Sequence, residues 1–204
     1  MIQPELLFTA ILKCPLNIWT FLYILVCRGS REGFVRHGHF DNQYSLYKQR
    51  LTNCSFVDGP LEITNLEGKY DLGFLKDIEE VTGYVLILNV YSNFLNLTKL
   101  RIIRGKELFE YRNRSYSLYV ALNHNPKDDS QGIMELQLTS LSEIVRGHVY
   151  FKNNNLLCFY NTILWEDINP SSVPSVYYDF DSPNFKRQCK YPEFSFTLVH
   201  TQNM

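Results

Sequence analysis

The segment Gly59-Pro60-Leu61-Glu62-Ile63-Thr64-Asn65 begins with a glycine and runs directly into the alternating residues of a β-strand. Three further segments have the same form: Gly83-Tyr84-Val85-Leu86-Ile87-Leu88-Asn89, Gly105-Lys106-Glu107-Leu108-Phe109-Glu110 and Gly147-His148-Val149-Tyr150-Phe151-Lys152-Asn153. The glycines are 24, 22 and 42 residues apart, and 42 is close to two steps of 21. A period in the low twenties is typical of a β-solenoid, whose turns bury their apolar side chains against one another. The spacing therefore predicts a coil of β-strands.

A second pattern precedes these glycines and supports the repeat. It is Leu75-x-x-Ile78-x-x-Val81-x-Gly83, repeated as Leu97-x-x-Leu100-x-x-Ile103-x-Gly105 and, with one extra residue, as Leu138-x-x-Leu141-x-x-Ile144-Val145-Arg146-Gly147. Repetition this loose indicates a diverged structural coil, and it carries no chemistry of its own.

Length and composition favour one β-rich domain with appendages. The chain has 204 residues, a formal net charge of −1, 14 Tyr and 14 Phe. Aromatic residues suit strands, and the balanced charge gives no support for nucleic-acid binding, which needs a basic stripe or patch.

An apolar run, residues 16–26, lies near the N-terminus. It is shorter than the roughly 20 residues that span a bilayer, but it has the length of a signal-peptide core. We therefore expect a signal peptide over residues 1–26. The alternative is that residues 21–26 belong to the first strand of the fold.

Five cysteines occur, and none lies in a C-x-x-C motif: Cys14, Cys27, Cys54, Cys158 and Cys189. Zinc sites are therefore not expected. If Cys14 leaves with a leader, four cysteines allow three pairings. The sequential one, Cys27 with Cys54 and Cys158 with Cys189, would close one loop at each end of the repeat region. Reduced thiols in a cytosolic protein are the alternative.

Three N-x-S/T sequons agree with a secreted chain: Asn53-Cys54-Ser55, Asn96-Leu97-Thr98 and Asn113-Arg114-Ser115. We expect glycans on Asn96 and Asn113. Asn53 is the least favoured acceptor, because its middle residue is a candidate disulfide cysteine.

Apolar residues at helical spacing, Phe40, Tyr44, Tyr47 and Leu51, predict a cap helix before the coil. The coil then occupies residues 54–157, interrupted by a polar surface loop at 123–132. After Cys158 the periodicity is lost, and residues 169–183 are rich in Pro and Ser.

No catalytic, metal or cofactor motif stands out. The five histidines, His37, His39, His124, His148 and His200, lack further ligands at suitable spacing, and neither G-x-S-x-G nor a P-loop occurs. Because some β-helices cleave carbohydrates, we considered the charged residues Glu62, Glu110, Arg104 and Arg146. A solvated sheet face explains them more simply, and no cofactor or metal is expected.

Several segments resemble the first L domain of the EGF receptor family, from about Val26 to Cys189. They are Val26-Cys27-Arg28-Gly29, Asn53-Cys54-x-x-x-x-Gly59-x-Leu61-Glu62-Ile63-Thr64, residues 70–87, Leu100-x-Ile102-Ile103-Arg104-Gly105, Leu157-Cys158 and Trp165-Glu166-Asp167-Ile168. The resemblance implies a mainly β fold, a leucine-rich-like right-handed β-helix with an N-terminal cap helix. The implied domain covers residues 27–189, with core repeats at 54–166 and an atypical tail at 190–204.

The resemblance also implies extracellular binding of an EGF-like polypeptide growth factor, and contact with other receptor ectodomains. The matching ligand-binding positions are Phe34, Arg36, Asn65, Asn89 and Glu110. Asn65 and Asn89 stand where the best-known members carry an aromatic and an aliphatic side chain, which favours a structural or assembly module as the alternative. With neither a membrane helix nor a kinase in the chain, we expect a ligand-binding fragment or decoy without enzymatic activity.

Overall fold

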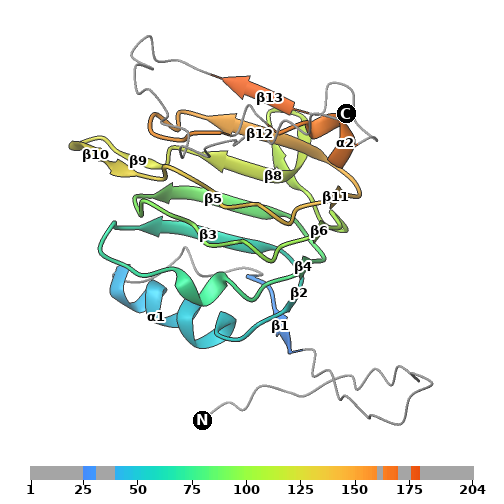
Figure 1. The fold of residues 1–204 in the computed structure, drawn as a ribbon, viewed down its shortest axis with the longest axis horizontal. Helices are drawn as coiled ribbons and strands as arrows, with labels where there is room; N and C mark the ends of the chain where they lie inside the picture. The colour runs from blue at the N-terminus through green and yellow to red at the C-terminus, as the bar shows by residue number, and fades with distance from the viewer. Residues whose placement is uncertain (1–24, 31–39, 160–162, 170–175, 180–204) are drawn as a thin grey trace, which may run out of the picture.

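The structure, a computed structural model, describes residues 25–30, 40–159, 163–169 and 176–179 (Figure 1). These residues form mainly β-strands with few helices, which confirms the expected β class. The helical elements are α1 (Phe40–Leu51), the 3₁₀ helix η1 (Gly73–Leu75) and α2 (Trp165–Ile168).

Two parallel sheets make up most of the described chain, and the polypeptide passes from one to the other and back. The small sheet has the order β1-β2-β4-β6-β11. Its strands are β1 (Val26–Arg28), β2 (Phe56–Asp58), β4 (Glu80–Val81), β6 (Ile102–Ile103) and β11 (Glu143–Ile144).

The large sheet has the order β13-β12-β8-β5-β3, and its strands stack above helix α1 in Figure 1. They are β3 (Leu61–Leu66), β5 (Val85–Val90), β8 (Arg114–Ala121), β12 (His148–Lys152) and β13 (Val176–Asp179). Strand β7 (Phe109–Tyr111) pairs antiparallel with β8. A separate hairpin joins β9 (His124–Asn125) to β10 (Asp128–Gly132).

The core lies between the two sheets, where side chains in register form one column from each. The large sheet contributes Ile63, Ile87, Val120 and Phe151, and the small sheet contributes Val57, Val81, Ile103 and Ile144. All eight are at most 1 % exposed. Burial of each such side chain contributes about 1.5–3 kcal/mol to folding, so the repeated apolar positions of the sequence are the source of stability.

The repeated glycines mark a corner at which successive passes of the chain stack backbone on backbone. The amide of Gly83 donates to the carbonyl of Gly59 at 2.9 Å, and the amide of Gly105 donates to the carbonyl of Gly83 at 3.1 Å. A Cβ on Gly83 would lie 2.6 Å from the backbone nitrogen of Pro60. Glycine recurs here because a side chain has no room.

The interval of 42 residues between Gly105 and Gly147 holds one pass of the chain, so the prediction of two short steps is wrong. β8 is followed in the large sheet by β12, and β6 in the small sheet by β11. The extra length is taken up by the β7–β8 hairpin and the β9–β10 hairpin. A hairpin returns the chain close to its starting point, and so it can be inserted without disturbing the stacked core.

The predicted surface loop at 123–132 begins with a residue that is fully buried. The side chain of Asn123 accepts a hydrogen bond from the amide of Val90 at 2.9 Å and donates to the carbonyl of Ile87 at 3.1 Å. Asn154 lies on the next pass, accepts from Asn123 Nδ2 at 2.9 Å and donates to the carbonyl of Val120. These buried amides satisfy backbone groups where the strands end, which composition alone did not reveal.

Helix α1 covers the free edge of β3. The Tyr47 hydroxyl accepts from the amide of Thr64 at 3.2 Å, and Gln43 Nε2 donates to the carbonyl of Thr64 at 2.9 Å. Next to them, the amide of Glu62 donates to Ser30 Oγ at 2.8 Å. An uncovered strand edge would invite pairing with another chain, so the helix predicted from its spacing does cap the end of the sheet.

A disulfide joins Cys27 of β1 to Cys54, which follows α1, with their Cα atoms 5.9 Å apart. Cys158 is also disulfide-bonded, and its partner lies outside the described residues. Several expected features also lie outside the described residues: most of the leader (1–26), Cys14, Cys189 and the tail (190–204). Of the expected leader, only residues 25 and 26 are described, and Val26 is already part of β1. Within the described part of the chain, no helix is long and apolar enough to cross a membrane.

Candidate functional site

The outward side of the large sheet is apolar, although no described element of comparable size covers it. Leu86 aligns with Tyr119 and Tyr150 in one row, and Leu88 aligns with Ala121 in the next. We define the outer apolar face as the cluster of these side chains with those of the adjoining hairpin: Tyr84, Leu86, Leu88, Phe109, Tyr111, Tyr116, Tyr119, Ala121 and Tyr150. It is separated from the core by the sheet itself.

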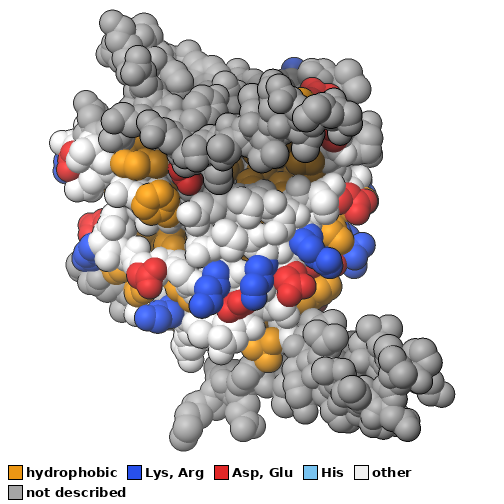
Figure 2. Space-filling model, in the orientation of Figure 1, with side chains coloured by type: hydrophobic (Ala, Val, Ile, Leu, Met, Phe, Trp, Pro, Cys, Tyr) orange, Lys and Arg blue, Asp and Glu red, His pale blue; other side chains and the backbone are white. Residues whose placement is uncertain are grey.

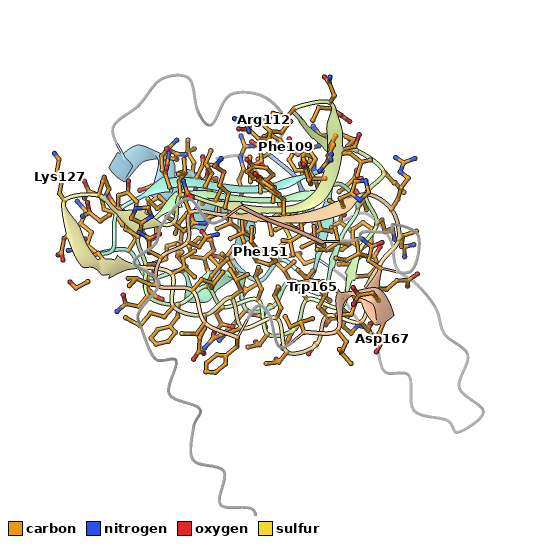
Figure 3. All side chains as sticks on the ribbon, turned by 90° about the horizontal axis from the view of Figure 1, so that it is seen from above. Phe109, Arg112, Lys127, Phe151, Trp165 and Asp167 are labelled. Atoms are coloured by element: carbon orange, nitrogen blue, oxygen red, sulfur yellow. A yellow bond between two sulfur atoms is a disulfide. The ribbon has the colours of Figure 1, made fainter. Side chains whose placement is uncertain are left out.

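The β7–β8 hairpin folds over part of this face. Arg112 and Asn113, at φ angles of 49° and 60°, form its two-residue turn, a geometry that matches the twist of a hairpin. The ring of Phe109 lies 4.8 Å from Tyr119 and 5.8 Å from Tyr84. Figure 3 shows Phe109 and Arg112 on one side of the sheet and Phe151 and Trp165 on the other.

The hairpin leaves one end of the face more open than the other. Tyr116, Tyr119 and Tyr150, beside or beneath the hairpin, are at most 7 % exposed. Leu88 of β5 and Tyr84, which immediately precedes that strand, are half-buried. Leu86 between them is 6 % exposed, so a polypeptide would meet this end of the face at Tyr84, Leu88 and Phe109.

At that open end, Glu62 of β3 faces outward beside Tyr84, which immediately precedes β5. The Tyr84 hydroxyl donates a hydrogen bond to Glu62 Oε1. Burial raises the pKa of the Glu62 carboxyl above its usual range, and burial together with this carboxylate raises the pKa of Tyr84. The face thus combines apolar rings with one carboxylate that is poorly solvated.

Asn65 and Asn89, two of the ligand-binding positions inferred from resemblance, lie side by side near the ends of β3 and β5. Their φ angles are 52° and 54°, and Asn89 Nδ2 donates to Asn65 Oδ1 at 3.0 Å. Asparagine adopts this left-handed conformation more readily than most residues. Both side chains therefore have a local structural role as well as a place beside the outer apolar face.

Glu110 lies at the middle of β7 and is exposed, opposite Ser115 of β8. Because neighbouring residues of a strand point to opposite sides, Phe109 and Tyr111 contact the sheet while Glu110 faces away from it. Phe34 and Arg36 lie outside the described residues.

The three sequon asparagines differ in exposure. Asn113 is exposed at the tip of the β7–β8 hairpin, and Asn53 is exposed next to the disulfide-bonded Cys54. Asn96 is half-buried, and its Oδ1 accepts a hydrogen bond from the Thr98 hydroxyl at 3.0 Å.

The charged residues considered for carbohydrate cleavage do not converge. Arg104 pairs with Glu80 on the small sheet, with Nη2 donating to Oε2 at 3.1 Å. Arg146 donates to the carbonyls of Gly105 and Lys106 at 2.9 and 2.7 Å. Figure 2 shows acidic and basic side chains interspersed on the face in view. These contacts hold the fold together and do not form an acid–base pair.

Among the described residues, no group of three or more His, Cys, Asp or Glu side chains is placed to hold a metal. His124 Nδ1 lies 3.0 Å from the carbonyl of Asn153, and the His148 ring meets the Tyr116 ring edge-on with ring centroids 6.3 Å apart. Both histidines therefore have packing partners of their own.

The sequence reasoning missed most of the outer apolar face, including Tyr84, Leu86, Phe109, Tyr119 and Tyr150. One sign was available. Glu62, Leu86 and Tyr119 occupy outward positions, because they alternate with inward residues in their strands. In a sheet whose outer face meets solvent, such positions normally carry polar residues, but Leu86 is apolar and Tyr119 is aromatic. An apolar residue at an outward position was the sign of a second packed or binding surface.

Residues 53–169 match the receptor L domain family. Receptor tyrosine-protein kinase erbB-4 of Mus musculus is 42 % identical over 150 residues, covering 74 % of this chain and 11 % of the relative. The epidermal growth factor receptor of Gallus gallus is 39 % identical over 158 residues, covering 77 % and 22 %. Receptor tyrosine-protein kinase erbB-2 of Mesocricetus auratus is 38 % identical over 172 residues, covering 80 % and 13 %.

The chain therefore spans between 11 % and 22 % of the length of these relatives. The family match covers every described residue from Asn53 to Asn169. It therefore includes the outer apolar face and both sheets, apart from the end strands β1 and β13. The chain belongs to the receptor L domain family, and its L domain is of the EGF receptor type.

Proposed function

We propose that this chain is an extracellular L domain that binds an EGF-like polypeptide growth factor on its outer apolar face. The observation that carries the proposal is the apolar, aromatic outward surface of a parallel sheet. Parallel sheets are normally covered on both faces, and this outward cluster has a partly open end at Tyr84, Leu88 and Phe109, whose side chains are half-buried.

The relatives support the same activity. One of them is named epidermal growth factor receptor, and the erbB relatives are named receptor tyrosine-protein kinases. Because this chain covers only a small part of each, the proposal concerns ligand binding by the L domain alone.

The fold proposed for this activity is a leucine-rich-like right-handed β-helix. It is supported by the alternation of the chain between two parallel sheets and by the glycine corner at which the passes stack. Such a coil offers one broad, rigid surface, the large sheet, on which a polypeptide can dock.

Within the proposed site, Phe34 would supply an apolar anchor, and Arg36, Asn65 and Asn89 would make polar contacts. Glu110 would attract a basic ligand residue from the outer side of β7. Phe109 and Tyr84 extend this set, because their rings border the open end of the face.

An extracellular location is supported by the Cys27–Cys54 disulfide and by the bonded Cys158. In secreted protein we expect Cys158 paired with Cys189 and glycans on Asn96 and Asn113. Non-reducing peptide mapping and glycosidase treatment test these points. Reduced Cys158 and Cys189 together with no mass shift would place the chain in another compartment.

Titration of the immobilised chain with recombinant epidermal growth factor tests binding. Glu110→Lys should weaken it about threefold to tenfold by reversing a charge beside the ligand. Glu143→Lys is the matched control, because Glu143 is exposed on β11 of the small sheet. The positive result for the wild-type chain is saturable binding that an excess of free chain abolishes. Equal affinities for the Glu110→Lys and Glu143→Lys variants would place the site away from β7.

A structural or assembly module that contacts another receptor ectodomain is the second candidate. It is favoured by the Asn65–Asn89 hydrogen bond, since both residues have a conformational role that needs no ligand. Absence of growth-factor binding, together with co-sedimentation with a receptor ectodomain, would support this alternative.

A further inference from the structure

Glu62 is a half-buried carboxylate of β3 that pairs with no cation in the described part of the chain. Its side chain accepts one hydrogen bond, from the neutral Tyr84 hydroxyl. Among the residues that the structure describes, no Lys or Arg forms an ion pair with it. A carboxylate withdrawn from water without a cation is costly.

Glu80 on the small sheet provides the contrast within the same chain. It is also half-buried, but the Arg104 guanidinium binds both of its carboxylate oxygens. On the small sheet Arg104 therefore balances the charge of Glu80, whereas on the large sheet no described Lys or Arg balances that of Glu62, at the edge of the outer apolar face.

The surroundings of Glu62 fit the stem and head of a long basic side chain. Leu86 lies directly beside Glu62 in the cross-strand row, and Tyr84, immediately before β5, reaches the carboxylate from the same segment of the chain. The rings of Tyr84 and Phe109 lie 5.8 Å apart at an angle of 52°. Aromatic faces attract Lys and Arg, and apolar groups accept their methylene stems.

We propose that Glu62, with the rings of Tyr84 and Phe109, forms a subsite for one Lys or Arg side chain of the polypeptide that docks on the outer apolar face. This inference rests on the proposed function and specifies the chemistry of its ligand. An incoming cation would provide an ion pair that no described Lys or Arg makes with Glu62, inside a partly desolvated site where such a pair is strong.

The subsite makes binding sensitive to acid. Burial raises the pKa of free Glu62, and a bound cation lowers it again, because the cation favours the ionised form. The groups that face it are Tyr84, just before β5, with Glu107 near that tyrosine, and Tyr47 of α1. The two tyrosines stay neutral below pH 8, since their pKa values are raised. Affinity should therefore fall as the pH drops through the raised pKa of Glu62.

The experiment uses the full chain with recombinant epidermal growth factor, and with variants of that factor in which each Lys and Arg is changed in turn to Gln. Glu62→Gln keeps an acceptor for Tyr84 but removes the charge, and it should weaken binding about tenfold. Glu143→Gln, on the exposed small sheet, should have no effect. One ligand substitution should weaken binding to the wild-type chain about tenfold and have no further effect on Glu62→Gln.

The pH arm compares affinities between pH 7.5 and pH 5. The wild-type chain should lose affinity with acid more steeply than Glu62→Gln. If Glu62→Gln fails to fold, the ligand variants and the wild-type pH profile still test the subsite, because both measurements use the unchanged chain.

Each outcome points in one direction. Equal binding by the wild-type chain and Glu62→Gln, or the absence of any sensitive basic residue in the ligand, overturns the subsite but leaves growth-factor binding intact. If the wild-type chain does not bind the growth factor at all, the proposed function fails, and the subsite fails with it.

Discussion

The small and large sheets are built from the same passes of the chain, but they differ in which residues change from one pass to the next. In the small sheet, β4, β6 and β11 each follow a similar run of leucines and isoleucines, and their inward residues are Val81, Ile103 and Ile144. In the large sheet the inward column is just as regular, but the outward row changes from Glu62 to Leu86 to Tyr119.

The two hairpins that break the period also emerge next to strands of the large sheet. The comparison teaches that the repeat preserves the core and the glycine corner, while the outward surface of one sheet is free to diverge. Function is therefore to be sought where the repeat is least regular.

The largest expected effect is on the shared core, where the two sheets should behave alike. Ile87→Ala in β5 and Ile103→Ala in β6 each remove a fully buried side chain. Each should lower the free energy of unfolding by about 2–5 kcal/mol, because a cavity remains. Urea unfolding measures this. Val145→Ala, at a side chain that is 41 % exposed, should change stability by less than about 0.5 kcal/mol. If only one of the two substitutions destabilised the chain, the sheet that carries the other isoleucine would contribute little to the free energy of unfolding.

The corner between the sheets should tolerate no side chain. Gly83→Ala places a Cβ against the backbone of Gly59 and Pro60, and should cost about 1–3 kcal/mol of stability. Gly73→Ala is the control, because the three atoms nearest to its Cβ would belong to the side chain of Asp71, which can move, and not to the backbone. Thermal unfolding of both variants tests the corner, and equal melting temperatures would contradict backbone stacking.

The strand ends of the large sheet should show the conformational role of asparagine. Asn89→Ala loses the hydrogen bond to Asn65 and keeps a strained positive φ, and should cost about 1–2 kcal/mol. Asn89→Gly relieves the strain and should be closer to wild type. Denaturant midpoints distinguish them. A glycine variant less stable than the alanine variant would show that φ is not the limiting factor.

The smallest effect contrasts two glutamates, and its sign differs between the sheets. Glu80→Gln weakens an ion pair with Arg104 and should destabilise the chain by about 0.5 kcal/mol. Glu62→Gln removes a charge that burial disfavours, and should be neutral or slightly stabilising at pH 7.

The pH dependence of stability checks the second glutamate. Since the folded-state pKa of Glu62 is raised, the folded chain binds the proton more tightly than the unfolded chain. The wild-type chain should therefore gain stability relative to Glu62→Gln as the pH falls from above the raised pKa to below the ordinary value of 4.5. A constant difference between pH 7 and pH 4 would show that the carboxylate is well solvated.

The β class, the cap helix and the repeated core positions could be predicted from the sequence because each depends on local periodicity. Tyr47 and Leu51 follow helical spacing, and Leu75, Ile78 and Val81 recur in order; all five are buried. The 42-residue interval was misread because a spacing of glycines cannot distinguish two short passes from one pass that carries two hairpins.

The sequence by itself determined which residues are apolar, where glycine recurs and which side chains can cap a strand edge. Only the tertiary structure decided that Phe109 folds back onto Tyr84 and Tyr119, that Asn123 is buried, and that Glu80 pairs with Arg104 while no described Lys or Arg pairs with Glu62. The reason is physical. Periodicity reports the side of its own strand on which a residue lies, whereas a surface is made by residues that are neighbours across strands, and their register is set by the packing of the whole sheet.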